Sequence, residues 1–594
     1  MDDFASSNLG SHAVLETVVH NQPPELKDWN PYASDPVLSR AVLRGGAGWH
    51  ESALVHQGAE CGSEATLRDA EDVQRYPPEL QSHDRAGERI DVVRFHPAWH
   101  RMMDLARRHG VANLSHLDDR PSAWTARAAA HVLHCQAEPG SSCPTTMTHA
   151  AIPVLRRHPA LHAALATRLA AREHDPRDLP IEQKFAVTLG MGMTERQGGS
   201  DVRGNLTQAV PLQGQTDGPW GTEFLITGHK WFFSAPMCDA HLVLARERGA
   251  DAQGGAELGL SCFFVPRWRP DGGRNTVHLQ RLKDKVGNRS NASAEVEFAA
   301  AWGVRVGEPG RGIGILLEMA TLTRLDCALS SAAFMRQGLV QALHHARWRK
   351  AFGKPLAEQP LMRSVLADMA LESEAAMLLA MDLAGRFGQA AAWQQGDAGT
   401  SGESTQALPD SDSLALDLAW RRLITPVAKY WNCKRAVAFA GEAMEVLGGN
   451  GYVESSPLAR LFREAPVNAI WEGSGNIMCL DMLRVAARHR EDAQRVLQHL
   501  DEVAGQAGCA PLQRLVQGLA VQFLRPAELL EPRARHAAQQ LALAAQGALM
   551  LQFGSPAATG IFVDSRLDPD WGAAWGGGAQ ALPAQELLAQ AWTA

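Results

Sequence analysis

The sequence predicts an α+β protein in which a β domain lies between two helical regions. From about residue 94 to 182, and again after residue 305, small and apolar residues recur every three or four positions, which is typical of packed helices. Between these positions, short apolar or alternating runs are separated by Gly, Pro and Asp, which indicates a compact antiparallel β domain. A chain of 594 residues is too long for one simple core, so we expect several domains.

Five segments follow one another along the chain. Residues 1–90 form an N-terminal extension, in which "NQPPELKDWNPYASDP" is extended or turned because proline blocks helices. Residues 91–185 form an N-terminal helical domain, and residues 186–305 form the middle β domain. Residues 306–490 form a helical bundle, and residues 491–594 form a C-terminal helical extension.

Local patterns refine these segments. "EFLITGHKWFFSA" predicts a strand, a Gly-His turn and a second strand. "LMRSVLADMALESEAAMLLAMDLAGR" predicts a long bundle-forming helix, because its apolar residues recur at helical spacing. The Gly- and Ser-rich residues 394–413 predict a surface loop or a disordered insert, and "WGAAWGGGAQALPAQ" predicts a weakly structured tail.

The composition excludes several classes of protein. Hydrophobic residues make up 45% of the chain and charged residues 21%, and the net charge of −8 gives no global attraction to nucleic acid or anionic membrane. The nine cysteines are scattered without a Cys-x-x-Cys pair, so neither a disulfide framework nor a metal site is expected. The start, "MDDFASSNLGSH", lacks signal-peptide features, and no apolar run has the length of a membrane span. These features predict a cytoplasmic protein.

Two motifs near the start of the β domain suit a ligand. In "MGMTERQGGSD" the paired glycines let the backbone approach a ligand, and Thr194 and Ser200 supply hydroxyl groups. The alternative is a simple polar turn, and the spacing is not that of a dinucleotide-binding GxGxxG motif. In "GHKWFFSAP" a flat aromatic residue beside a serine suits a planar cofactor, although core packing explains the same pattern.

Two further motifs lie in the helical bundle. "HHARWRKAFGKPLAEQPLMR" carries a basic cluster that could hold phosphates, and a solvated helix face or a nucleic-acid contact are the alternatives. "VLGGNGY" ends a helix in left-handed geometry. In "NAIWEGSGNIMCL", Glu472 lies between apolar residues and small flexible ones, where a carboxylate is costly unless it is paired or used. A position at a helix start, where an acid suits the helix dipole, is the alternative.

Together these motifs resemble the acyl-CoA dehydrogenase family. "MTERQGGSD", "HKWFFS", "KVGNRSNASAEVEF", "RWRKAFGKPLAEQ", "EVLGGNGY" and "IWEGSG" occur in the order and at the spacings of that family. Other stretches, among them "NQPPELKDWN", "SSCPTTMTHA" and "NIMCLDMLRV", are similar to the AidB-type branch of adaptive alkylation-response flavoproteins. The similarity covers most of residues 18–490 and extends loosely into the tail.

The resemblance implies an acyl-CoA dehydrogenase-like fold. This fold has an N-terminal helical domain, a middle antiparallel β domain and a C-terminal four-helix bundle, here with an extra C-terminal helical domain. It implies FAD between the β domain and the bundle, an acyl-CoA or related small-molecule ligand, no membrane contact, and a homotetramer.

The resemblance also implies which residues contact FAD. The loop of Thr194 and strand residues near Ser234 match positions beside the flavin ring, and Arg349 matches a position that grips the pyrophosphate and adenosine part, often across a subunit interface. The implied contacts are Met193, Thr194, Gly199, Ser200, Trp231, Phe233, Ser234, Arg349, Phe352, Gln359, Gly448, Gly449, Trp471, Gly473, Ser474, Gly475, Asn476 and Asp481.

By resemblance, Glu472 is the catalytic base. Removal of a proton alpha to a thioester needs a positioned carboxylate in a dry site, where its basicity is raised. The AidB-type branch places an arginine in the same site, and it falls on Arg484 here. An arginine close to Glu472 would lower the pKa of that carboxyl and weaken the base, whereas a surface arginine is the alternative. The first interpretation predicts weak acyl-CoA oxidation.

AidB-like proteins are also associated with DNA binding through a basic C-terminal domain. Residues 491–594 depart from that pattern, because six arginines face ten acidic residues and give a net charge of −4 without any lysine. Binding through phosphate neutralisation needs local positive charge. Arg525, Arg533 and Arg535 from several subunits could still line a channel for double-stranded DNA.

Three functions stay open at this point. The first is an AidB-like flavoprotein with a role in the alkylation-damage response and residual dehydrogenase activity. The second is a fully active acyl-CoA dehydrogenase for an unusual branched or bulky substrate. The third is a DNA-binding protein that keeps FAD as a structural cofactor. The retained Glu472 argues against the third, and the acidic tail argues against strong DNA binding.

Overall fold

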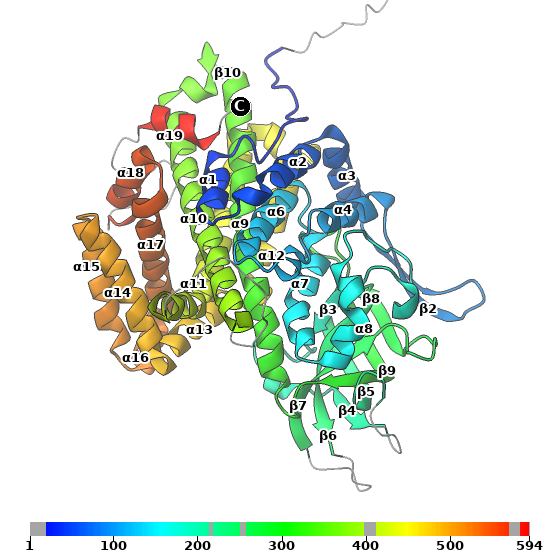
Figure 1. Ribbon diagram of the computed structural model, residues 1–594. Coiled ribbons are helices and arrows are strands. Elements are labelled where there is room, and N and C mark those ends of the chain that lie inside the picture. The colour runs from blue at the N-terminus through cyan, green and yellow to red at the C-terminus, as the bar shows by residue number, and fades with distance from the viewer. Residues whose placement is uncertain (1–19, 213–217, 250–256, 397–410, 569–582, 593–594) are drawn as a thin grey trace, which may run out of the picture.

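The computed structural model describes residues 20–212, 218–249, 257–396, 411–568 and 583–592 (Figure 1). Three long helices run through the middle of the molecule, with the β domain at one end and the C-terminal helices along one side (Figure 1). Most of residues 394–413, and most of the glycine-rich tail, lie outside the described residues.

The N-terminal segment becomes helical earlier than the sequence predicts. Residues 20–35 are largely extended or turned, as expected, until Asp35 caps α1 by accepting hydrogen bonds from the amides of Val37 and Leu38. The expected boundary at residue 90 falls inside a strand of a β hairpin. The elements are α1 (Pro36–Arg44), α2 (Glu51–Cys61), α3 (Glu64–Arg75), β1 (Glu79–His83) and β2 (Arg89–Arg94).

The N-terminal helical domain packs directly on the long helix α9. Every residue of the alanine-rich α6 is buried, because small side chains let neighbouring helices approach on all sides. Arg127 of α6 and Thr146 of α7 both bind the buried Asp326 of α9, and the Arg127 Nη2 to Asp326 Oδ2 distance is 2.7 Å. The elements are α4 (Pro97–Arg108), α5 (Leu114–Leu117), α6 (Ala123–Ala137), α7 (Ser142–Arg156) and α8 (Pro159–Ala170).

The middle domain is a seven-stranded sheet in which β6 pairs with both β4 and β7, so that part of it closes on itself. Most pairs are antiparallel, as predicted, but β6 pairs in parallel with β3 and with β4. The strands are β3 (Leu189–Gly192), β4 (Gln208–Pro211), β5 (Glu223–Ser234), β6 (Ala240–Arg248), β7 (Glu257–Pro266), β8 (Val277–Leu282) and β9 (Ser293–Val306).

The predicted Gly-His turn inside "EFLITGHKWFFSA" is wrong. β5 runs unbroken through these residues, and its register against β9 shifts between Ile226 and Gly228. Gly228 has a φ of +150°, and a Cβ atom there would lie 2.6 Å from the Cα atom of Thr207. The glycine therefore serves a bulge and a close backbone approach, not a chain reversal.

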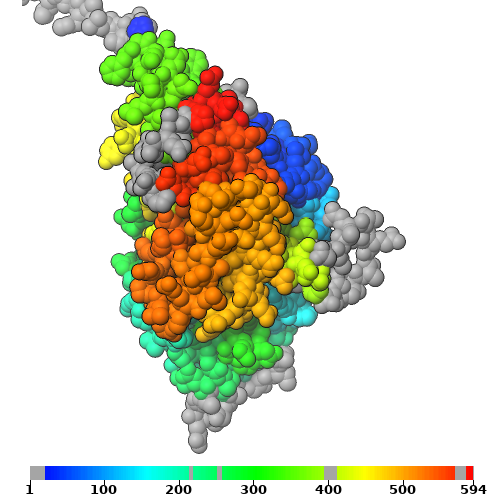
Figure 2. All heavy atoms as spheres, turned by 90° about the vertical axis from the view of Figure 1, so that its left-hand side faces the viewer, coloured from blue at the N-terminus to red at the C-terminus, as the bar shows by residue number. Residues whose placement is uncertain are grey.

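The helical bundle consists of three helices of 36 or 37 residues, with shorter ones packed against them. The long helix predicted from Met362 onward is confirmed as α10. Between α9 and α10 the chain forms a small hairpin that protrudes at the upper end of the molecule (Figures 1 and 2). The elements are α9 (Gly312–Trp348), β10 (Lys350–Ala351), β11 (Lys354–Pro355), α10 (Pro360–Gly396), α11 (Ser411–Val446), η5 (Gly448–Gly451), α12 (Pro457–Asn468) and α13 (Gly475–Arg488).

The C-terminal extension is helical, as predicted, and packs on the bundle. α17 contacts α10, α11 and α13, while α14 and α15 form the outer face seen in Figure 2. The elements are α14 (Arg490–Gln506), α15 (Ala510–Phe523), α16 (Ala527–Leu530), α17 (Ala534–Phe553), α18 (Pro556–Arg566) and α19 (Ala584–Ala591). In the described part of the chain, no helix combines the length and hydropathy needed to cross a membrane.

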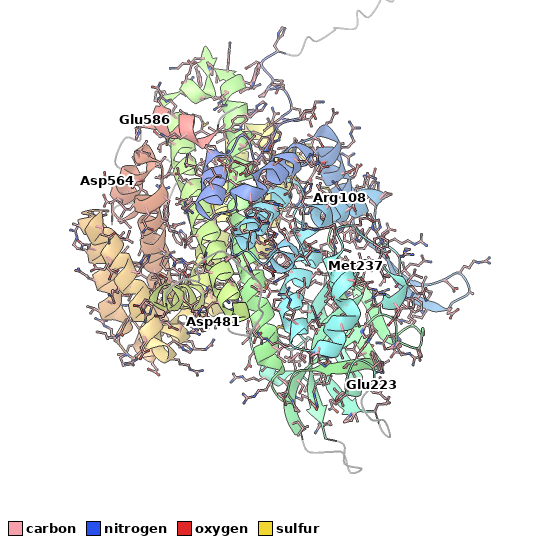
Figure 3. The ribbon with its side chains drawn as sticks, viewed as in Figure 1. Arg108, Glu223, Met237, Asp481, Asp564 and Glu586 are labelled. Atoms are coloured by element: carbon pink, nitrogen blue, oxygen red, sulfur yellow. The ribbon has the colours of Figure 1, made fainter. Side chains whose placement is uncertain are left out.

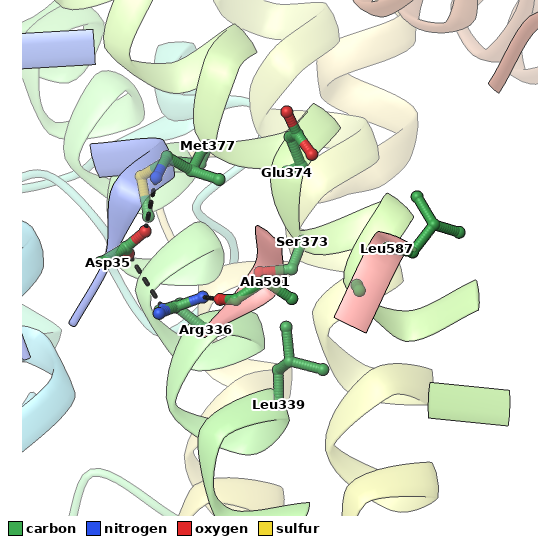
Figure 4. Close-up of a pocket in the computed structure, with 10 residues that line it drawn as sticks. Asp35, Arg336, Leu339, Ser373, Glu374, Met377, Leu587 and Ala591 are labelled. Atoms are coloured by element: carbon green, nitrogen blue, oxygen red, sulfur yellow. Dashed lines mark hydrogen bonds and ion pairs between the residues drawn. The ribbon is translucent and has the colours of Figure 1, made fainter. Parts of the chain in front are cut away.

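After the predicted glycine-rich tail, most of which lies outside the described residues, the chain forms the helix α19. α19 docks between α1 and α10, and Trp592 is buried against Trp29 with a ring distance of 6.4 Å. Arg336 of α9 pairs with Asp35 at 3.0 Å and donates a hydrogen bond to the backbone oxygen of Ala591 (Figure 4). It also donates a hydrogen bond to the backbone oxygen of Ser34. One buried cation thus joins both ends of the described chain to the bundle.

Candidate functional site

Glu472 lies in the turn between α12 and α13, not in a helix. The helix-start interpretation is wrong, because α13 begins at Gly475 and its N-cap residue is Ser474. Glu472 has a φ of +57°, which a residue with a side chain rarely adopts. Such strained backbone persists only where surrounding contacts hold it, and it concentrates at functional sites.

Three side chains from the long helices hold this turn. Thr323 of α9 donates a hydrogen bond of 2.7 Å to Oε2 of Glu472, and the next residue, Arg324, donates one of 2.9 Å to its backbone oxygen. Lys429 of α11 donates to the backbone oxygens of Trp471, at 2.8 Å, and of Gly473. The half-buried carboxylate is therefore fixed from both sides.

The electrostatic balance favours a stronger base. Burial raises the pKa of Glu472 above its usual value, and the Thr323 hydrogen bond and the charges of Arg324 and Lys429 oppose this shift without reversing it. A carboxyl with a raised pKa is a better proton acceptor in its ionised form.

The predicted approach of Arg484 to Glu472 is wrong. Arg484 is exposed on α13 and pairs with Asp481, one turn away on the same helix. Asp481 also pairs with Arg324 at 3.0 Å. The arginine that reaches the Glu472 turn is Arg324 of α9. Spacing along α13 could not predict this contact, because it depends on how the helices pack.

The loop from Met193 to Ser200 lies against the end of β5. The amide of Trp231 donates a hydrogen bond of 3.0 Å to the backbone oxygen of Thr194. A Cβ atom on Gly199 would lie 2.6 Å from Oγ1 of Thr194, so this turn needs its glycine. Ser200 is exposed, and Asn205 holds the backbone oxygen of Met193 at 2.7 Å.

The aromatic residues of β5 point in different directions. Phe233 was expected to contact the cofactor, but it is buried in the core of the β domain and stacks on His241 with ring centroids 3.9 Å apart. Trp231 is half-buried, with Nζ of Lys283 3.5 Å from its ring centroid. Phe232 is 56% exposed and is not among the contacts expected from the sequence. Alternation of faces along β5 could have pointed to it as a partner of Ser234.

A cluster of sulfur-containing side chains joins the Glu472 turn to the β domain. Trp471 packs against a buried group formed by Cys143 and Met147 of α7 with Ala235 and Cys238 after β5. Met191 and Met237 pack against the same group. Both the Glu472 carboxylate and the Ser234 hydroxyl act on the pKa of the Cys143 thiol, which burial raises to about 12. Glu472 and the end of β5 therefore face the same region.

The second group of expected FAD contacts lies elsewhere in the chain. Arg349, Phe352 and Gln359 surround the hairpin after α9, where Phe352 is 98% exposed with a φ of +52°. Gly448, with a φ of +60°, ends the long helix in left-handed geometry, as predicted. Gly449 is exposed, and a Cβ atom there would meet nothing within 4 Å.

The hairpin and the Glu472 turn lie at different levels of α9. From Thr323 to the end of α9 at Trp348 the helix rises about 37 Å. In Figure 3, Asp481 of α13 lies at the lower part of the bundle, whereas Glu586 of α19 lies near the hairpin. Within one chain, the expected FAD contacts at the hairpin and those near the Glu472 turn therefore do not form a single site.

The three C-terminal arginines also differ in their surroundings. Arg535 donates a hydrogen bond of 2.8 Å to Oδ1 of Asn476, in the first turn of α13. Arg525 and Arg533 are exposed, and their side chains form no ion pair within the described ranges. Arg535 is thus tied to the predicted cofactor region and not to a basic surface.

A small cavity lies between α1, α9, α10 and α19, lined by Asp35, Arg336 and Glu374 among others (Figure 4). It contains none of the predicted site residues and belongs to the junction of the chain ends. No group of three or more His, Cys, Asp or Glu side chains in the described residues could hold a metal ion.

A β domain packed on a helical bundle, with the half-buried Glu472 carboxylate facing the junction, defines a flavoprotein dehydrogenase architecture. Three family models match the chain in order. They describe the N-terminal domain of the adaptive response protein AidB at residues 21–176, the acyl-CoA dehydrogenase middle domain at 190–301, and the acyl-CoA dehydrogenase C-terminal domain at 310–399 and 407–487. The chain belongs to the acyl-CoA dehydrogenase family.

Individual relatives agree with this assignment. The chain is 46% identical to AidB of Escherichia coli (strain K12) over 540 residues, which are 91% of this chain and 92% of that protein. It is 29% identical to acyl-CoA dehydrogenase family member 11 of Caenorhabditis elegans, over 89% of this chain and 84% of the relative. The crystal structure of Caenorhabditis elegans ACDH-11 in complex with C11-CoA has a TM-score of 0.80 at 26% identity and covers 96% of both chains.

Proposed function

We propose that this protein is an FAD-dependent acyl-CoA dehydrogenase of the AidB-like branch, with Glu472 as the base that removes the alpha proton of an acyl-CoA thioester. The observation that carries the proposal is the strained turn of Glu472, which three helix side chains hold at the junction of bundle and β domain. Membership of the acyl-CoA dehydrogenase family supports it.

The residues at this junction fit a flavin. Thr194, Ser200 and Ser234 offer hydroxyl groups, and Trp231 and Phe232 offer aromatic surface that is not fully buried. Such a set suits a planar ring with polar edges. FAD bound there supplies the acceptor for the hydride that leaves the beta carbon.

Glu472 has one oxygen free for the substrate. Thr323 binds Oε2, whereas Oε1 has no hydrogen-bond partner among the described residues. The proton therefore moves from the alpha carbon to Oε1. Burial raises the basicity of the carboxylate, and Thr323 fixes its orientation, which general-base catalysis requires.

The structure removes the reason to expect suppressed activity. Weak oxidation was expected because an arginine at position 484 would pair with the base, but Arg484 pairs with Asp481. The opposing charges come from Arg324 and Lys429, and they leave the pKa of Glu472 raised. We therefore propose a competent base. The role in an alkylation response stays a prediction, supported by the likeness to AidB.

The ligand class follows from the same site. The half-buried side chains of Met191, Met237 and Trp471 offer apolar surface that suits an acyl chain, since methionine side chains adapt their shape. The C11-CoA complex of ACDH-11 supports an acyl-CoA ligand for this chain as well.

An anaerobic titration of the FAD-loaded protein with linear and branched acyl-CoAs tests the proposal. We expect one thioester to bleach the flavin absorbance, and Glu472→Gln to retain its colour and ligand binding without bleaching. Protein that binds FAD and acyl-CoA but stays oxidised with every thioester contradicts the proposal. Failure to bind FAD at all contradicts the cofactor assignment.

We further propose that the functional unit is an oligomer, with a homotetramer as the family expectation. Thr323, which holds the Glu472 turn, and Trp348, which precedes the hairpin, are separated by about 37 Å along α9, further than one extended dinucleotide reaches. The two groups of expected FAD contacts can hold the same FAD only if they come from different copies of the chain. The exposed apolar residues Trp348, Phe352 and Leu361 at the hairpin support a contact between copies.

DNA binding is the second candidate, favoured by the exposed Arg525 and Arg533, which form no ion pair with another described residue. Against it stands the net charge of −4 on residues 491–594. A gel-shift series with double-stranded DNA at increasing salt tests it. If the candidate is correct, binding weakens steeply with salt and falls in an Arg525→Ala, Arg533→Ala double variant. Absent or salt-insensitive binding removes it.

A further inference from the structure

Lys429 is an unusual buried lysine. It lies in the middle of α11, is 1% exposed, and among the described residues its ammonium group donates only to the backbone oxygens of Trp471 and Gly473. In the described residues no carboxylate lies within ion-pair distance of it, whereas the buried Lys184 and Lys230 pair with Asp239 and Glu195. A buried charge without an ion pair is costly, so its retention needs a reason.

The carbonyl groups that Lys429 binds flank Glu472 on both sides. Arg324 binds the carbonyl of Glu472 itself, so three consecutive backbone oxygens accept hydrogen bonds from cations on α9 and α11. Free carbonyls at such a turn would turn toward water, and the backbone would relax to negative φ. The two cations oppose that relaxation.

The same contacts set the direction of the side chain. With the backbone at a φ of +57°, Oε2 of Glu472 reaches Thr323, and Oε1 has no hydrogen-bond partner in the described part of the chain. The charged or titratable groups that act on the carboxylate are Arg324, Lys429 and the thiols of Cys143 and Cys327. Burial raises the pKa of both thiols, so at neutral pH they are uncharged.

We propose that Lys429 is a positioning residue that clamps the Trp471–Gly473 turn and thereby aims Oε1 of Glu472 at the ligand. Its catalytic meaning rests on the proposed function, but the clamp itself does not. The ammonium group reaches the reacting atoms only through Glu472. Its loss should therefore change the order of the turn and the rate of proton removal, and leave the affinity for acyl-CoA unchanged.

Hydrogen–deuterium exchange of the FAD-loaded protein tests the clamp directly. Ile470 and Trp471 donate their amides to the carbonyl of Val467, so a peptide covering 468–475 reports the order of the turn. In Lys429→Met we expect exchange in this peptide about tenfold faster. Lys429→Arg, which keeps a cation, should recover part of the protection. If Lys429→Met does not fold, Lys429→Gln replaces it, because its shorter uncharged side chain does not bridge both carbonyls.

Arg336→Met is the matched control. Arg336 is also a buried cation that binds two backbone carbonyls, but at the junction of Asp35 and Ala591. The Arg336→Met variant should have a lower melting temperature but wild-type hydrogen–deuterium exchange in residues 468–475. The clamp is overturned if the 468–475 peptide of Lys429→Met exchanges at the wild-type rate. It is also overturned if Arg336→Met changes the exchange of this peptide by the same amount.

Flavin reduction and acyl-CoA affinity complete the test. If an acyl-CoA reduces the wild type, Lys429→Met should slow the reduction about a hundredfold at nearly constant affinity, because a small misplacement of the base has effects of this size. A loss of affinity instead overturns the positioning role. If no acyl-CoA reduces the wild type, the proposed function fails while the exchange result still decides the clamp.

Discussion

Oγ1 of Thr323 lies 2.7 Å from Oε2 of Glu472, although 149 positions separate the two residues in the sequence. This contact ties the turn after α12 to the middle of the bundle. It favours the ionised carboxylate, and burial works in the opposite direction. The pKa of Glu472 is therefore influenced by side chains of α9 and α11, which approach this turn only in the folded protein.

Thr323→Val should move the acid limb of flavin reduction to higher pH. Glu472 must be ionised to take a proton, and loss of the Thr323 hydrogen bond raises its pKa further, so at a given pH less of the base is active. We expect a shift of about one pH unit. Stopped-flow reduction as a function of pH measures it. Thr321→Val, two residues earlier on α9, should leave the limb unchanged, and an unshifted limb in Thr323→Val contradicts the assignment.

Gly473→Ala should destabilise the turn after Glu472. Gly473 has a φ of +111°, and a Cβ atom there would lie 2.5 Å from Cε of Met478. Backbone strain of this kind costs about 1–3 kcal/mol of the free energy of unfolding. Gly518→Ala in α15, where a Cβ atom meets nothing within 4 Å, should be neutral or slightly stabilising. Thermal unfolding compares the two, and equal stability of both variants speaks against the strain.

Stability should fall as the pH drops below about 6.5. Burial lowers the pKa of His116 to about 3 and of His131 and His134 to about 4. The unfolded chain binds protons at these positions from about pH 6.5 downward, but the folded protein does not, so acid favours unfolding. Each histidine changes the free energy of unfolding by up to about 1.4 kcal/mol per pH unit in this window.

Melting temperatures between pH 7.5 and pH 5 measure this effect. His116→Asn should flatten the dependence, whereas His56→Asn, at an exposed position, should not. Carboxylates with lowered pKa values, such as Asp175 at about 2, lose their contribution only below about pH 4 and do not interfere. If the melting temperature of His116→Asn falls with pH as steeply as that of the wild type, the buried neutral His116 is not a cause of the pH dependence.

Phe352→Ser should weaken assembly without changing the fold of one chain. The side chain is 98% exposed at the tip of the hairpin, so a monomer loses no packing when it is replaced. If the hairpin contacts a second copy, the variant should dissociate at a higher concentration in light scattering after gel filtration and should bind FAD less tightly. Leu529→Ser, at a 67% exposed leucine of α16, serves as the control. Unchanged mass and FAD affinity contradict the interface.

Local patterns in the sequence anticipated much of the fold. The 3.6-residue periodicity predicted α10, and the glycine at position 448 predicted a left-handed helix end. Both depend on interactions within a few residues, which the sequence states directly. The prediction of a turn at Gly228 was wrong, because a glycine between apolar residues is equally compatible with a turn and with a bulge. Only the pairing of β5 with β9 decides between them.

The candidate site shows the same difference between what local sequence patterns predict and what tertiary contacts decide. The sequence by itself determined the family and the order of its matched domains, because these follow from motifs in fixed order, and the same motifs predict Glu472 as the base. Only the tertiary structure decided which residues contact Glu472 and its turn. Arg484 pairs with Asp481 on its own helix, whereas the contacts come from Thr323 and Arg324 of α9 and Lys429 of α11. Spacing fixes contacts within one helix, but contacts between helices depend on how the whole bundle packs, and this electrostatic environment sets the basicity of Glu472.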